Sequence, residues 1–379
     1  MQDNYQQKIL GIVGGGQLGR MVIQSAINYN VDIHILDPDE NAPCKHICHD
    51  FTNGKLTDYD TVYAFGKQCD IITIEIENVN TEALEQLAKE GKKVFPQPEI
   101  IRLIQDKREQ KQFYKANNIP TADFILTDTK EAVLANADFL PAVNKLGKEG
   151  YDGRGVQVLK SEEDLDMAFE APSLLEKLID FEKEIAVIVS RNEHGELVAF
   201  PPVECAFHPT ANLVEFLFAP AQIADAIGEK AIKVAKDVIL KLDMIGILAV
   251  EMFVTKSGEI LVNEIAPRPH NSGHHTIEAN FTSQFEQHLR SVMGMPLGDT
   301  GLRMPAAMVN LLGEDGFTGD AVVEGMDEAM KEKGVYIHLY GKKITKPFRK
   351  MGHVTILEEN VEALKVKALK IKESIKIKA

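Results

Sequence analysis

Residues 249–275, AVEMFVTKSGEILVNEIAPRPHNSGHH, contain the feature that decides the fold of this chain. Two apolar runs rich in β-branched residues flank the turn signal Ser257-Gly258, a pattern typical of a β-hairpin. With a loop of even length centred on this turn, the predicted cross-strand pairs are Glu251 with Glu264, Phe253 with Val262 and Met252 with Asn263. The pattern therefore predicts two carboxylates directly opposite each other among apolar neighbours.

This carboxylate pair requires a cation. At about 4 Å and an effective dielectric constant of about 20, two carboxylates repel by roughly 4 kcal/mol before desolvation is counted. A shared proton or a metal relieves the repulsion, and a site with few protein oxygens suits Mg²⁺, which takes its other ligands from water and substrate phosphates. An exposed hairpin with two solvated glutamates is the alternative, but both faces of this hairpin are apolar. We therefore predict that Glu251 and Glu264 bind Mg²⁺.

The composition is that of a soluble globular enzyme with two or three domains, since 44% of the 379 residues are hydrophobic and 26% are charged. The net charge of −15 argues against a nucleic-acid partner. No apolar run approaches the roughly 18 residues of a membrane span and no signal segment opens the chain, so we expect a cytoplasmic protein without a membrane partner. The four cysteines, including Cys44 and Cys48 near two histidines, predict neither a disulfide framework nor a zinc site.

The order of the expected elements divides the chain into three regions. Residues 1–99 alternate strands and helices, which predicts a parallel, Rossmann-like α/β sheet. Its strands are expected at 9–13, 31–36, 70–74 and 94–95, and its bounded helices at 17–29 and 81–90. Residues 100–298 begin with two helices and continue with strands and hairpins around a glycine-rich loop, and residues 299–379 end in a lysine-rich helix. We therefore predict a three-domain fold that mixes α/β and α+β regions.

The glycine-rich turn at residues 14–19 follows the first expected strand and opens the first helix. Together with Asp37 at the end of the next strand, it matches the dinucleotide-binding fingerprint. A nicotinamide-dependent oxidoreductase is therefore one hypothesis. Backbone amides at a helix N-terminus can equally receive another anionic or polar substrate, so the fingerprint alone leaves both hypotheses open.

Further along, the strand at residues 140–145 ends in Lys145 and precedes a loop with glycines at 147, 150, 153 and 155. The loop lacks the ending of a Walker motif, but its amides can close over phosphate oxygens, with Lys145 and Lys107 supplying positive charge. The short apolar segment at residues 174–179 can read an adenine edge through its backbone, and Glu184 can accept both ribose hydroxyls. Each of these signals is weak by itself, and together they indicate a nucleotide site.

In this order, the motifs resemble the 5-(carboxyamino)imidazole ribonucleotide synthetase family of the ATP-grasp superfamily. The resemblance covers nearly the whole chain and rests on GGQLG at 15–19, IEIEN at 74–78, QDKREQK at 105–111, GYDGRG at 150–155, NEIAPRPHNSGH at 263–274 and RKMGH at 349–353. One departure is visible: where many members have Asp-Arg, this chain has Asp106-Lys107-Arg108. The nucleotide contact of that arginine then passes to Lys107, a point charge instead of a planar fork, with Arg108 as a possible substitute.

The resemblance implies an ATP-grasp fold with a Rossmann-like pre-ATP-grasp domain, and it also implies the site residues. The expected ATP contacts are Lys107, Lys145, Gly150, Tyr151, Asp152, Gly153, Arg154, Gly155, Glu176, Lys177, Leu178, Ile179, Glu184, His208, Asn263 and Glu264. Mg²⁺ is expected at Glu251 and Glu264. The expected contacts of aminoimidazole ribonucleotide are Gln17, Leu18, Glu75, Tyr151, Arg154 and a phosphate clamp of Lys342, Arg349 and Lys350. Arg268, His270 and Asn271 are expected to face bicarbonate, and with Tyr151 and Arg154 they form the expected catalytic group.

The implied reaction is the carboxylation of aminoimidazole ribonucleotide with ATP and bicarbonate, through carboxyphosphate, in purine biosynthesis. The family also implies a homodimer. Two alternatives remain at this point: a related ATP-grasp ligase that activates formate for glycinamide ribonucleotide, and the NAD-dependent oxidoreductase.

Overall fold

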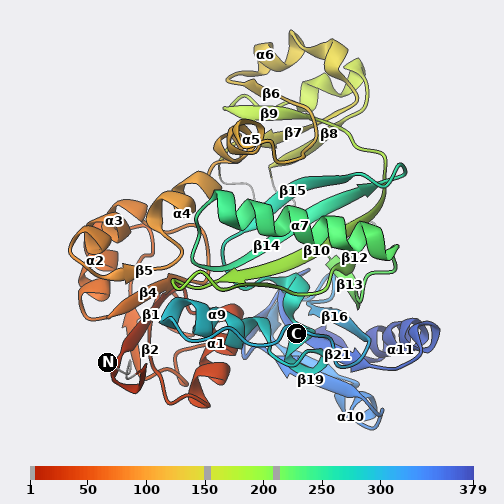
Figure 1. The fold of residues 1–379 in the computed structure, drawn as a ribbon. Helices are drawn as coiled ribbons and strands as arrows, with labels where there is room; N and C mark the ends of the chain where they lie inside the picture. The colour runs from red at the N-terminus through yellow and green to blue at the C-terminus, as the bar shows by residue number, and fades with distance from the viewer. Residues whose placement is uncertain (1–4, 149–154, 208–213) are drawn as a thin grey trace.

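The computed structural model describes residues 5–148, 155–207 and 214–379 (Figure 1). Its N-terminal part is a parallel five-stranded sheet in the order β3-β2-β1-β4-β5. The strands are β1 (Ile9–Val13), β2 (Asp32–Asp37), β3 (Asp50–Asn53), β4 (Ile71–Ile74) and β5 (Lys93–Val94). Between them run α1 (Gln17–Ile27), α2 (Tyr59–Lys67) and α3 (Thr81–Lys89), which confirms the predicted alternation. Only β3 was not predicted, because its sequence DFTN is short and largely polar.

Helices α4 (Pro98–Ile104) and α5 (Lys107–Ala116) connect this sheet to an antiparallel four-stranded sheet. That sheet has the order β6-β9-β7-β8. Its strands are β6 (Phe124–Thr127), β7 (Ala142–Leu146), β8 (Val156–Leu159) and β9 (Ser173–Lys177), and α6 (Lys130–Leu134) follows β6. Helix α5 begins directly after Asp106, whose carboxylate caps it by accepting from the amide of Arg108. The cap fixes the start of the helix that carries Lys107.

The largest sheet has nine strands and follows the path β15-β14-β10-β12-β13-β16-β21-β19, with β11 paired to β10. Its strands are β10 (Phe181–Arg191), β11 (Leu197–Ala199), β12 (Val203–Phe207), β13 (Val214–Ala219), β14 (Gly246–Thr255), β15 (Ile260–Ala266), β16 (Ala306–Leu312), β19 (Val335–Leu339) and β21 (Lys350–Leu357). The strands that follow residue 298 therefore continue the sheet of the central region. The smaller elements of this part are α8 (Thr276–Ala279), α10 (Met326–Ala329), β17 (Gly319–Asp320), β18 (Val322–Glu324), β20 (Ile344–Thr345) and β22 (Lys376–Lys378).

Three helices cover this sheet or join it to the first one. Helix α7 (Asp225–Lys241) packs on β10, β14 and β15, and α11 (Val361–Ser374) packs on β16 and β21. Helix α9 (Gln284–Met293) contacts both α1 and β14, so it links the first sheet to the largest one (Figure 1). Among the described residues, no helix has the length and apolar character needed to cross a membrane.

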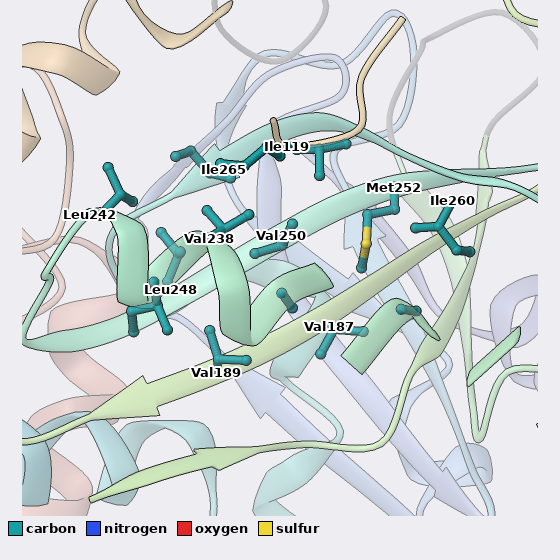
Figure 2. Close-up of a cluster of buried hydrophobic side chains, with 14 of the residues drawn as sticks. Ile119, Val187, Val189, Val238, Leu242, Leu248, Val250, Met252, Ile260 and Ile265 are labelled. Carbon is teal, nitrogen blue, oxygen red and sulfur yellow. The ribbon is translucent and has the colours of Figure 1, made fainter. Parts of the chain in front are cut away.

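The core under α7 determines which way the carboxylates point. Figure 2 shows Val187 and Val189 of β10 together with Leu248, Val250 and Met252 of β14 in one apolar cluster with α7. Because side chains alternate along a strand, Glu251 projects from the opposite face of the sheet. Glu184 lies on that same opposite face, since β10 and β14 pair Ala186 with Glu251 and Glu184 with Phe253.

The register of the β14–β15 hairpin differs from the prediction. Glu251 is paired with Glu264 as predicted, but Met252 pairs with Val262 and Phe253 with Leu261, so the predicted Phe253–Val262 and Met252–Asn263 pairs are wrong. The loop has an odd length, because Val254 pairs with Ile260 and Gly258 adopts a positive φ of 77°. A bulge between Glu251 and Met252 then leaves Asn263 as an extra residue and restores the carboxylate pair.

Candidate active site

The glycine-rich turn at the start of α1 is occupied by the protein's own carboxylates. The amide of Gly15 donates to Asp37 Oδ2 at 2.7 Å, and the amide of Gly19 donates to Glu75 Oε2 at 3.1 Å. A Cβ atom at Gly16 would lie 2.2 Å from Glu75 Oε1, so the carboxylate lies directly against this turn. A dinucleotide pyrophosphate would have to displace these two acidic groups, which disfavours the oxidoreductase hypothesis.

Three glutamates share the face of the largest sheet that lies opposite α7. Burial, together with the charge of Glu264, raises the pKa of Glu251 to about 7. Burial also raises the pKa of Glu184 to about 8, with the charge of Glu251 adding to the effect. Burial acts on Glu264 in the same direction, but the charge and hydrogen bond of Lys107 outweigh it, so the pKa of Glu264 is lowered. Ionisation of Glu251 is therefore unfavourable in the opposed pair, and a bound cation would relieve this.

The donor set of this pair fits Mg²⁺. No group of three or more His, Cys, Asp or Glu side chains with the arrangement of a metal site occurs among the described residues. Two carboxylates alone leave most of an octahedral shell to water and phosphate oxygens, which is the usual protein contribution for Mg²⁺.

Lys107 contacts this pair, whereas its neighbour Arg108 does not. Lys107 Nζ forms an ion pair with Glu264 Oε1, and the backbone amide of Lys107 donates to Gly147 O at 2.8 Å. Arg108 Nη2 instead donates to the exposed carboxylate of Asp128 at 2.7 Å. Of the two candidates left by the unusual sequence at this point, Lys107 is therefore the one that lies with the carboxylates.

A buried polar network lies beside Lys107 and lines a small cavity. Lys145 Nζ contacts Glu176 Oε2 at 2.9 Å and donates to Asn263 Oδ1, also at 2.9 Å. Lys111 Nζ donates to the other oxygen of Glu176 at 2.8 Å. The cavity is lined by Lys107, Gln110, Lys111, Lys145, Leu174, Glu176, Asn263 and Glu264.

No role was predicted for Lys111, although it belongs to one of the quoted motifs. A signal was available, because Lys107 and Lys111 are four residues apart on an expected helix and therefore share one face.

The segment after β15 brings a second polar group to the same carboxylates. His270 Nε2 lies 3.4 Å from Glu251 Oε1, and His270 Nδ1 accepts from the amide of Ser272 at 3.3 Å. This arrangement fits the tautomer with a proton on Nε2. Arg268 Nε lies 2.9 Å from Glu77 Oε1, which ties the segment to the first domain. The amide oxygen and nitrogen of Asn271 are both enclosed and have no hydrogen-bond partner among the described residues.

The basic segment at residues 341–350 lies against the first domain. Lys342 Nζ donates to Lys350 O at 2.8 Å, so the side chain of Lys342 lies against the backbone of Lys350. Lys343 Nζ donates to Asn41 Oδ1 at 2.9 Å, and Gly341 lies near the guanidinium of Arg20 on α1. Gln17 and Leu18 form the first turn of α1, so they lie in the same part of the molecule as this segment and Glu75.

Arg349 and Lys350 of the basic segment have different interactions. Arg349 Nη1 donates to Ile344 O at 2.6 Å, so part of its fork is used within the segment. The positive charge of Lys350 acts on Glu251, whose pKa it lowers in opposition to burial.

Other expected contacts are placed elsewhere or lie outside the described residues. Lys177 Nζ donates to Phe139 O at 3.0 Å and lies over the Phe139 ring, so its side chain is directed away from the carboxylates. Leu178 is 37% exposed, and it and Ile179 follow directly after β9. Gly155 adopts a positive φ of 72° and its carbonyl accepts from Leu146. The expected contacts Gly150, Tyr151, Asp152, Gly153, Arg154 and His208 lie outside the described residues.

Three domain families match the chain in succession. They are a ribonucleotide synthetase preATP-grasp domain over residues 7–105, an ATP-grasp domain over residues 112–285 and a phosphoribosylaminoimidazole carboxylase C-terminal domain over residues 306–367. This succession confirms the predicted three-domain ATP-grasp fold class.

Among full-length relatives, the N5-carboxyaminoimidazole ribonucleotide synthase of Bacillus subtilis is 37% identical, over 94% of this chain and 93% of the relative. The chloroplastic phosphoribosylaminoimidazole carboxylase of Vigna aconitifolia is 40% identical, over 94% of this chain, but the chain spans only 65% of that longer protein.

Solved structures agree with these relatives. The N5-carboxyaminoimidazole ribonucleotide synthetase of Thermotoga maritima has a TM-score of 0.91 and 41% identity, covering 98% of this chain and 100% of that one. The Aspergillus clavatus N5-carboxyaminoimidazole synthase, solved with ADP and 5-aminoimidazole ribonucleotide, has a TM-score of 0.88 and 31% identity, covering 97% of this chain and 99% of that one. The chain therefore belongs to the N5-carboxyaminoimidazole ribonucleotide synthetase family of ATP-grasp ligases.

Proposed function

We propose that this chain carboxylates the exocyclic amine of 5-aminoimidazole ribonucleotide with ATP and bicarbonate, giving N5-carboxyaminoimidazole ribonucleotide, ADP and phosphate in purine biosynthesis. The observation that carries the proposal is the setting of the Glu251–Glu264 pair. Lys107 contacts Glu264, Lys145 contacts the preceding residue Asn263, and His270 lies 3.4 Å from Glu251. A phosphate donor and a small anion can therefore meet at one pair of carboxylates.

In this proposal Glu251 and Glu264 hold Mg²⁺. The metal supplies positive charge against the phosphate oxygens, and the raised pKa of Glu251 is the sign that this position favours such charge. Lys107 and Lys145 add fixed positive charge at the same place, which stabilises the negative charge spread over the transferring phosphoryl group.

The remaining ATP contacts follow the family motifs. The backbone of residues 176–179 reads the adenine edge, Glu184 accepts the ribose hydroxyls and Asn263 lies beside the metal ligands. The glycines and side chains of residues 150–155, together with His208, complete the nucleotide site. The similar structures solved with ADP or ATP support this part of the proposal.

The chemistry proceeds in two transfers. An oxygen of bicarbonate attacks the γ-phosphorus of ATP, ADP leaves, and carboxyphosphate results. The exocyclic amine then attacks the carboxyl carbon of carboxyphosphate, or carbon dioxide released from it, while phosphate leaves and the amine loses a proton. Arg268 and Asn271 hold the anion, and His270, hydrogen-bonded to Ser272, orients it beside Glu251. No protein nucleophile takes part, Tyr151 and Arg154 contact the ribonucleotide, and the site must exclude water, which would destroy carboxyphosphate.

The ribonucleotide lies between the start of α1 and the basic segment. Gln17, Leu18 and Glu75 contact its ring and sugar, and Lys342, Arg349 and Lys350 clamp its phosphate. A remote phosphate clamp fixes the position of the amine, so binding energy is converted into orientation of the reacting groups.

Three further features belong to this proposal. The domains are residues 1–99, 100–298 and 299–379, a division that the successive family matches support. The protein acts in the cytoplasm, and it forms a homodimer. Light scattering from the purified protein at several concentrations tests the dimer, and a constant monomer mass would contradict it.

The reaction is tested by measuring ADP release while each substrate is supplied in turn. We expect ADP release to require 5-aminoimidazole ribonucleotide and to be accompanied by uptake of labelled bicarbonate carbon into an acid-labile carbamate. Equal activity with formate and glycinamide ribonucleotide would favour the other ATP-grasp ligase. Titration with reduced nicotinamide dinucleotide should leave its fluorescence unchanged, because Asp37 and Glu75 occupy the amides of the glycine-rich turn.

A further inference from the structure

Lys111 carries an ammonium group that is buried at the junction of three elements. It lies one turn after Lys107 on α5, and its Nζ donates to Glu176 Oε1 at 2.8 Å and also to Thr121 Oγ1. The side chains of Lys111 and Glu176 are each only 4% exposed. Burying two such charges costs several kcal/mol per ion before their attraction is counted, so a pair this deep is weak evidence of a purely stabilising role.

The contacts of Lys111 reach both sheets of the nucleotide site. Glu176 belongs to β9 in the four-stranded sheet. Thr121 donates through its hydroxyl to Val262 O at 2.7 Å, and the amide of Val262 donates to Pro120 O at 2.8 Å. Val262 lies on β15, the strand that carries Asn263 and Glu264. Lys111 therefore connects α5 directly to β9 and, through Thr121, to β15.

The same contacts divide the charge of one carboxylate between two ammonium groups. Glu176 Oε1 faces Lys111 and Glu176 Oε2 faces Lys145. Two positive charges and one negative charge leave this trio with a net charge of about +1. Without Lys111, only Lys145 would face Glu176. The remaining pair would then have no net charge. The neighbouring Lys107 has its own carboxylate in Glu264 and cannot replace the missing charge.

We propose that Lys111 is a positioning residue for nucleotide binding: it balances the charge of Glu176, so that the trio keeps a net positive charge and Lys145 keeps its place beside Asn263 for the phosphates of ATP. The inference rests on the proposed function, which places Lys145 against the nucleotide. Lys111 itself lines the cavity but acts through Glu176 and Lys145.

The first test compares Lys111→Met with Lys111→Arg and with Lys115→Met, an exposed lysine one turn later on α5. Lys111→Met should raise the KM for ATP by about tenfold, the loss of one charge-assisted interaction, and leave the KM for the ribonucleotide within a factor of about three. Lys111→Arg should restore most of the affinity for ATP, and Lys115→Met should leave both constants unchanged. Equal increases in both constants, or no change in Lys111→Met, would overturn the proposal.

The second test uses Glu176→Gln, which keeps the backbone groups of β9 but removes the charge that Lys111 balances. The double variant Lys111→Met/Glu176→Gln should bind ATP several-fold more tightly than Lys111→Met, because Glu176 no longer offsets the positive charge of Lys145. A role of Lys111 in packing alone predicts no such recovery. If the double variant binds ATP as weakly as Lys111→Met, the proposal is wrong.

Direct titration with ADP and Mg²⁺ separates this inference from the proposed reaction. A protein that binds ADP but releases none in the presence of 5-aminoimidazole ribonucleotide would contradict the proposed reaction, and the ADP dissociation constants of the same variants would still decide the role of Lys111. The melting temperature of each variant identifies any that does not fold, and the charge-retaining Lys111→Arg then carries the comparison.

Discussion

Glu251 and Glu264 lie directly opposite each other on β14 and β15, yet the pairs between them and the turn, from Met252–Val262 onward, are shifted by one residue. The odd-length loop shifts the register in one direction, and the bulge at Asn263 shifts it back. The two paired carboxylates have different surroundings. The pKa of Glu251 is raised to about 7 by burial and by its partner, and the pKa of Glu264 is lowered because Lys107 outweighs burial.

Because of this asymmetry, we expect Glu251→Gln and Glu264→Gln to differ in their effect on stability but to have similar effects on turnover. Glu251→Gln and Glu264→Gln should each lower turnover by at least about 100-fold, because each removes stabilisation of transition-state charge worth roughly 3 kcal/mol or more. Without metal, Glu251→Gln should melt at the wild-type temperature or above it, since it removes a repelled charge. Glu264→Gln should melt lower, since it breaks the contact with Lys107. Thermal melting and ADP release in excess Mg²⁺ check both parts.

A large drop in the melting temperature of Glu251→Gln would show that the pair is structural. Glu259→Gln, in the exposed hairpin loop, is the control, and it should alter neither turnover nor stability by a measurable amount.

The hairpin also shows how far the sequence could be interpreted. Alternation of apolar residues around Ser257-Gly258 was sufficient to predict the two strands and the opposed carboxylates. It could not reveal the bulge at Asn263, because a bulge depends on how one strand bends over its neighbours and leaves no period of its own. The carboxylate pair was predicted correctly even though the assumed loop length was wrong, since the two irregularities compensate.

Contacts between distant segments were the other limit. Nothing in the local pattern indicates that Arg108 turns to Asp128, or that Asp37 and Glu75 occupy the glycine-rich turn. Such contacts depend on the folded arrangement of separate elements, which one sequence does not reveal. The motif around residues 14–19 was therefore compatible with a dinucleotide until its amides were seen to have partners.

Lys107 and Arg108 provide a comparison between adjacent cations. Lys107→Met should raise the KM for ATP by about tenfold, because Lys107 lies on Glu264 beside the proposed phosphate site. Arg108→Met should leave this constant within a factor of about two, since an exposed pair such as Arg108–Asp128 contributes little. Initial rates of ADP release over a range of ATP concentrations make the comparison. The opposite order would mean that Arg108 rotates onto the nucleotide when it binds.

Glu75 should make the stability of the protein depend on pH. Burial raises its pKa from 4.5 to about 7, so the folded state holds the proton more tightly than the unfolded state. Ionisation of Glu75 therefore destabilises the fold, and stability should decline as the pH rises from about 4.5 to 7. The effect of this one group is at most about 3 kcal/mol.

Glu75→Gln should weaken that decline, because an amide oxygen can still accept from Gly19 but carries no charge. Its melting temperature relative to wild type should increase by about 2 °C or more between pH 5 and pH 8. Glu40→Gln, at an exposed position, should follow wild type throughout. Parallel curves for Glu75→Gln and wild type would contradict a raised pKa at this carboxylate.

The basic segment is tested by separating the ribonucleotide phosphate from the phosphates of ATP. Arg349 presents a planar fork suited to a phosphate dianion, and Lys342 lies against the backbone of Lys350, the next residue. Arg349→Ala should therefore raise the KM for 5-aminoimidazole ribonucleotide by at least about tenfold, the loss of one charge-assisted contact, while the KM for ATP stays within a factor of about three. Steady-state rates with each substrate varied in turn measure both constants.

Lys343→Ala is the matched control, because Lys343 belongs to the same segment but is exposed and donates to Asn41. It removes the same charge from the segment, so any change that both variants share reflects the general field of the basic cluster, which falls off with added salt. A specific clamp predicts that only Arg349→Ala loses affinity, and that the loss persists at high salt because the contact is direct. If Arg349→Ala instead raises the KM for ATP as much as that for the ribonucleotide, the basic segment belongs to the nucleotide site; if neither constant moves, Arg349 serves only its hydrogen bond to Ile344.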